Sequence, residues 1–134
     1  MTPLKVNTAI MCEFLTETPN NKHTLVNVIP GDMILHQFPS NIPVAFYFEV
    51  TPKLDEEADY IIEIKFGKKR AGYATAHVAF EAGKQGVIAL PFGLLAVEAP
   101  GAVVVSIGRE GERPTVLLKK QLIAAGDATS SNDS

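Results

Sequence analysis

Apolar residues recur at every second position over much of this chain, and this alternation constrains the fold more than any other feature. It is the spacing that places side chains on one face of a β-strand. In the clearest run, residues 59–66, the side chains turned toward a core would be Tyr60, Ile62, Ile64 and Phe66. Six further runs predict strands of the same kind: residues 6–14, 23–29, 43–50, 73–81, 102–109 and 115–122.

Turn-forming residues separate these runs. Pro, Gly and Asn cluster at residues 19–22, 67–72, 81–86 and 110–114, where they supply the backbone conformations that tight turns need. Residues 52–58 are the one candidate for a single helical turn after a proline. Strands that follow one another without long helices pair antiparallel. The sequence therefore predicts an all-β, antiparallel β-sandwich of seven to eight strands, like immunoglobulin and fibronectin domains.

The length and composition predict one soluble domain. The chain has 134 residues, and we expect residues 1–125 to form a single β-sandwich and the small, polar residues 126–134 to be a disordered tail. The single cysteine excludes an internal disulfide, and residues 1–5 lack the features of a signal peptide, so we expect a cytoplasmic protein. A net charge of −3 argues against nucleic-acid binding, and the longest apolar stretch is too short to span a membrane.

The polar candidates for a metal or phosphate site each favour a simpler interpretation. His23, His36 and His77 have no ligand-like spacing, and the acidic residues 55–59 would need oxygen ligands from distant loops, such as Asp32 and Glu110. The basic residues 68–70 are typical of a charged hairpin turn that discourages aggregation. We therefore expect no metal and no cofactor.

No catalytic arrangement is evident in the sequence. Cys12 alternates with apolar residues and is predicted to be buried. Ser106 lies in a segment that lacks the first glycine and the following helix of a nucleophile elbow. The sequence has neither a phosphate loop nor a dinucleotide-binding fingerprint. These observations predict that the protein is not an enzyme.

The most apolar segment, residues 87–97, is too irregular for one regular strand. Part of it is predicted to be a core strand, and the rest, around Pro91, to cross the open end of the sandwich as a loop. Such a loop is either tucked under the domain or covered by another molecule, and the sequence does not decide between these. If it is covered, the residues of the interface would be Leu90, Phe92, Leu94 and Leu95.

Several short segments carry a resemblance to a known family. They are residues 9–13, 21–28, 38–39, 46–50 and 99–101, together with the Gly-Arg-Glu-Gly turn at 108–111. With these segments the chain, as far as about Ile123, resembles a family of small bacterial proteins of unknown function that are predicted to be β-sandwiches. The resemblance implies the fold and assigns no catalytic residue. The closing hairpin also resembles that of immunoglobulin-like domains, which serve mostly in recognition.

Together these features predict a non-enzymatic interaction or structural module that self-associates or binds a protein partner. One alternative is a sandwich that binds a small ligand or carbohydrate, although the chain has no Trp and only Tyr47, Tyr60 and Tyr73 to stack on sugars. A phage-derived accessory protein on the same fold is another.

Overall fold

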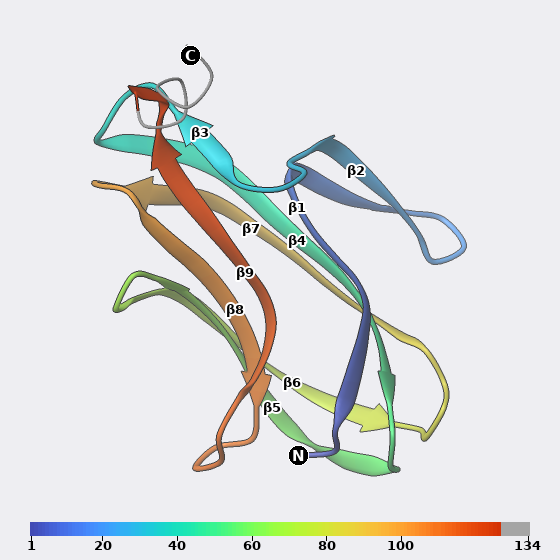
Figure 1. Ribbon diagram of the computed structural model, residues 1–134. Helices are drawn as coiled ribbons and strands as arrows, with labels where there is room; N and C mark the ends of the chain where they lie inside the picture. Colours follow the sequence, from blue (N-terminus) through green and yellow to red (C-terminus); the bar gives the residue numbers. More distant parts are fainter. Residues whose placement is uncertain (127–134) are drawn as a thin grey trace.

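The computed structural model describes residues 1–126 and contains two packed β-sheets (Figure 1). The four-stranded sheet has the order β2-β1-β4-β7, and the five-stranded sheet has the order β3-β9-β8-β5-β6. The nine strands are β1 (Leu4–Thr18), β2 (Lys22–Val28), β3 (Met33–Leu35), β4 (Ser40–Pro52), β5 (Glu56–Phe66), β6 (Lys69–Phe80), β7 (Gly86–Val97), β8 (Gly101–Gly108) and β9 (Thr115–Ala124). The all-β sandwich prediction is confirmed. The predicted tail lies outside the described residues except for Gly126.

The fold departs from the sequence prediction in two strands and one connection. Strand β3 has only three residues and pairs parallel with β9, so residues 1–126 contain nine strands and one parallel pair. Residues 86–97 are not a loop but one continuous edge strand, β7, paired with β4. The predicted helical turn at 52–58 is wrong, because β4 ends at Pro52 and β5 begins at Glu56.

The core lies between the sheets and is built from the inward-facing residues of the alternating runs. On β4, Phe46 and Phe48 are fully buried and their rings stack with centroids 6.4 Å apart. Across from them in the other sheet, Tyr60 packs edge-on against Phe80 at 5.2 Å. Burying side chains of this size contributes about 1.5–3 kcal/mol each to folding. The core therefore depends on the period of two that the sequence displays.

A β-bulge shifts the alternation of β7. Val44 pairs with Gly93 and Phe46 pairs with Leu90, so Pro91 and Phe92 both lie opposite Ala45. Gly93 has a φ of +116°, which a residue with a side chain rarely adopts. The bulge explains why residues 87–97 do not have the pattern of a regular strand.

The β1–β2 hairpin extends beyond the rest of its sheet on the right of Figure 1. Strand β1 pairs with β4 only as far as Cys12, and from Cys12 to Thr18 it pairs with β2. The turn carries Asn20 and Asn21 in the left-handed conformation that suits hairpin turns. Residues 13–28 thus form a two-stranded arm that does not pair with β4. Within residues 1–126, no helix is long and apolar enough to cross a membrane.

Candidate interaction surface

The four residues predicted as an interface have different surroundings in β7. Leu95 is 2% exposed and belongs to the core. Leu90 and Phe92 are partly buried and pack against the core, with the Phe92 ring lying against Gly72 of β6. Leu94 is 68% exposed and lies opposite Pro43 of β4. Of the four, only Leu94 presents most of its side chain to solvent.

Three further exposed apolar side chains lie on the β1–β2 hairpin, which the sequence analysis did not single out. Phe14, 55% exposed, is the cross-strand partner of Val26, and Cys12 pairs with Val28. Side chains of directly paired residues share one face of a hairpin. Phe14, Val26 and Val28 therefore form an apolar ridge on the solvent side of the arm.

The other side of the arm faces the sandwich. Leu15 pairs with Leu25, and both are partly buried. Nearer the tip, the ring of His23 lies 5.4 Å from the ring of Tyr47 on β4, and the Tyr47 hydroxyl donates a hydrogen bond to Glu49 at 3.1 Å. The contact between His23 and Tyr47 joins this side of the arm to the outer side of the four-stranded sheet.

An apolar hollow of about 370 Å³ lies where the arm leaves the sheet. Residues 13–15 form one wall, and Pro43, Val44, Ala45, Pro91, Gly93 and Leu94 form the other. The hollow brings Phe14 and Leu94 to one surface although 80 residues separate them in the sequence. We call this surface the apolar face and define it by Phe14, Val26, Val28, Pro43, Pro91 and Leu94.

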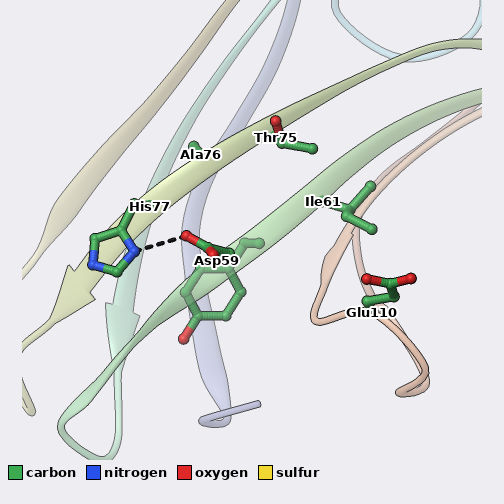
Figure 2. Close-up of a pocket in the computed structure, with 7 residues that line it drawn as sticks. Asp59, Ile61, Thr75, Ala76, His77 and Glu110 are labelled. Carbon is green, nitrogen blue, oxygen red and sulfur yellow. Dashed lines mark hydrogen bonds and ion pairs between the residues drawn. The ribbon is translucent and has the colours of Figure 1, made fainter.

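The outer side of the five-stranded sheet carries a hollow of similar size, about 380 Å³, with a different character (Figure 2). Asp59 and Ile61 of β5 and Thr75, Ala76 and His77 of β6 line it, with Glu110 from the β8–β9 loop. His77 lies between two carboxylates: its Nδ1 is 2.7 Å from Asp59 and its Nε2 is 2.8 Å from Glu57. Hydrogen bonds to Glu57 and Asp59 raise the pKa of His77 above its ordinary value.

Both ring nitrogens of His77 contact carboxylates, and the raised pKa favours the protonated imidazole that pairs with them. No group of three or more His, Cys, Asp or Glu residues among residues 1–126 is arranged to hold a metal ion. The cluster is a set of mutually compensating charges.

The charge pairing continues along the same side of the sheet. Glu63 lies 2.5 Å from Arg70 and 3.3 Å from Lys65, and the Arg70 guanidinium lies 4.8 Å from the centre of the Tyr73 ring. We call this surface the charged face. Its members are Glu57, Asp59, Glu63, Lys65, Arg70 and His77.

Three other candidate residues from the sequence analysis are buried or hydrogen-bonded within the fold. Cys12 is fully buried, as predicted, and burial raises the pKa of its thiol, which disfavours the reactive thiolate. Ser106 is buried on β8. Asp55 accepts a hydrogen bond from the Ala82 amide at 2.7 Å.

Glu56, within the predicted acidic segment, also has partners in the chain. It accepts hydrogen bonds from the Thr2 amide, at 3.0 Å, and from the Tyr60 hydroxyl. The hydrogen bond from Tyr60 is the main reason that the pKa of Glu56 lies below its ordinary value, and burial raises the pKa of Tyr60. Glu56 therefore stabilises the fold around the buried Tyr60.

The fold defines the chain as an all-β sandwich protein with an extended hairpin arm. No protein-family model matches it, and no curated protein matches its sequence. The resemblance to a bacterial family of β-sandwich proteins therefore stays a prediction.

Proposed function

We propose that this protein is a non-enzymatic interaction module that self-associates through its apolar face, and that the partner is a second copy of the same chain. The observation that carries the proposal is the pairing of an exposed ridge, Phe14, Val26 and Val28, with the adjacent apolar hollow. In a two-fold dimer each surface meets the same surface of its partner, so the ridge of one copy can enter the hollow of the other.

The apolar face would form the centre of a dimer interface. A specific interface engages about 20–30 residues on each side and buries about 800 Å² per partner. The outward-facing residues of the arm and the exposed residues of the opposite wall of the hollow supply its apolar part. Apolar surface contributes about 25 cal/mol per Å² when it leaves water, before the costs of association are subtracted.

Sedimentation velocity at several concentrations tests the proposal. We expect the wild-type protein to form a dimer at micromolar concentration. Replacing both Phe14→Ser and Leu94→Ser should give a monomer with an unchanged circular dichroism spectrum, because both side chains are more than half exposed.

A matched pair of substitutions is the control. Tyr73→Ser with Leu54→Ser removes one aromatic and one leucine side chain of similar exposure, 62% and 61%, outside the apolar face. This variant should remain a dimer. A wild-type protein that is monomeric at every concentration, or a control variant that dissociates as readily as the test variant, would contradict the proposal.

A further inference from the structure

A hollow of about 530 Å³ lies at one end of the sandwich. One wall is the end of the β5–β6 hairpin, residues 66–71, and the other is the end of β7 with the β7–β8 loop. Figure 1 shows these two connections on the left of the molecule. The volume lies within the range of about 300–1,000 Å³ that is typical of small-ligand sites.

The inner part of this hollow is apolar and is formed by two phenylalanine rings. The Phe66 ring lies so close to Gly101 that an added Cβ there would be 3.1 Å from it. A Cβ at Gly72 would lie only 2.4 Å from the Phe92 ring. Because Gly101 and Gly72 have no side chains, the two phenylalanine rings have room to lie against the hollow. Leu95 and Pro100 complete the apolar lining.

The walls are held in place by the backbone. The β5–β6 turn has only two residues between the paired Phe66 and Lys69, and Gly67 at its first position has a φ of +61°, which suits a tight hairpin turn. The Gly67 amide donates a hydrogen bond to the Ala102 carbonyl of β8 at 2.9 Å. A preformed site of this kind loses little conformational entropy when it binds a ligand.

The rim of the hollow carries uncompensated positive charge. Arg70 lines it, but its guanidinium is paired with Glu63 on the charged face. Lys68 and Lys69 also line the hollow, and within residues 1–126 neither forms an ion pair. Among the described residues of the lining, Glu98 alone is negatively charged, so the two lysines outnumber it.

We propose that this hollow binds a small amphiphile with an apolar chain and a carboxylate head, of the class of medium-chain fatty acids. The chain would pack against Phe66, Phe92 and Pro100, and the carboxylate would lie between Lys68 and Lys69 at the rim. The ligand proposal does not depend on the proposed dimer, because this hollow and the hollow of the apolar face have one lining residue in common, Leu94.

Other ligand classes fit the lining less well. A carbohydrate needs several neutral hydrogen-bonding side chains, and the polar side chains of this lining are all charged. A positively charged amphiphile would have only Glu98 to pair with and would meet both lysines. The combination of apolar floor and cationic rim therefore favours an anionic head on an apolar chain.

Isothermal titration calorimetry with dodecanoate below its micelle-forming concentration tests the proposal on the full chain. We expect saturable binding that weakens with added salt, because salt screens exposed charges. Amide NMR shifts should concentrate at residues 66–71 and 98–101. Dodecanol and dodecyltrimethylammonium should bind more weakly.

Charge variants locate the head group. Lys68→Gln with Lys69→Gln should weaken dodecanoate binding about fivefold to tenfold, the effect of losing two partly exposed charge interactions. Lys5→Gln with Lys119→Gln removes the same charge from exposed positions elsewhere and should leave the affinity unchanged. The proposal is overturned if dodecanoate shows no saturable binding, if dodecanol binds as tightly, or if the two double variants weaken binding equally.

Discussion

The two outer sides of this sandwich differ in how their side chains are compensated. On the charged face, Glu63 has two cationic partners and His77 has two anionic ones. On the apolar face, Phe14 and Leu94 remain more than half exposed although they border the same hollow. The charges of the charged face are compensated within one chain, whereas the apolar face is stabilised only when another molecule covers it.

The difference shows where to look for a partner. Exposed ion pairs contribute about 0–1 kcal/mol each, so a surface made of such pairs has little to gain from a second molecule. A large exposed apolar surface on a folded domain is typical of an interaction site. The comparison therefore supports the four-stranded sheet and its arm as the proposed interaction surface.

The largest expected effect separates the apolar face from the core within a single strand. Leu95→Ala should lower the free energy of unfolding by about 2–5 kcal/mol, because it leaves a cavity beneath β7. Leu94→Ala should change it by less than about 1 kcal/mol, because its side chain is already in water. Urea unfolding at a fixed, low protein concentration measures both. Equal losses would mean that Leu94 is part of the core and not of the apolar face.

An intermediate effect is expected at the centre of the charged face. Burial raises the pKa of Glu63, but hydrogen bonds from Arg70 and Lys65 outweigh it, and the net pKa lies below the ordinary value. The stabilising contribution of Glu63 is therefore present above the unfolded pKa and is lost as the pH falls through the folded pKa. Glu63→Gln should cost about 0.5–1 kcal/mol near neutral pH and less in acid.

Urea unfolding at several pH values measures this pH dependence. Glu98→Gln is the control, since Glu98 has no ion-pair partner within residues 1–126. A cost of Glu63→Gln that does not change with pH would show that the substitution acts through packing and not through the ion pairs.

The smallest effect is expected at His77 and is visible in its titration. NMR should give a pKa above 6.5, the ordinary value, and Glu57→Gln with Asp59→Asn should bring it back toward that value. Since the folded pKa is raised, any contribution to stability is present below the unfolded pKa and is lost as the pH rises through the folded pKa. A His77 pKa at or below 6.5 would show that the carboxylates do not hold the ring.

The alternating strands were predictable because their inner faces are uninterrupted. Tyr60, Ile62 and Ile64 are all buried at every second position, as the pattern indicates. Strand β3 was not predictable, because three residues carry no measurable period and its parallel pairing depends on where β9 lies. In β7 the extra residue at the bulge reverses the alternation of apolar side chains, so the sequence of this strand resembles that of a loop.

The apolar face could be predicted only in part. Phe14 and Val26 lie at equal distances from Asn20, so the register of a hairpin with its turn at that residue would have paired them. Their proximity to Leu94 depends on the strand order β2-β1-β4-β7, and no local pattern in the sequence encodes that order. The exposure of these side chains likewise depends on which strands lie at an edge of the sheet.

The place of β4 at the centre of its sheet has a consequence for how the chain folds. Its two neighbours are distant in sequence, since Leu4 pairs with Pro52 and Val50 pairs with Gly86. The β1–β2, β5–β6 and β8–β9 hairpins need only local contacts, which form within about 1–10 μs. Sandwiches dominated by non-local pairing fold in milliseconds to seconds. Local contacts alone can therefore form the arm before its sheet is assembled. In a chain at that stage the apolar ridge has no folded domain behind it.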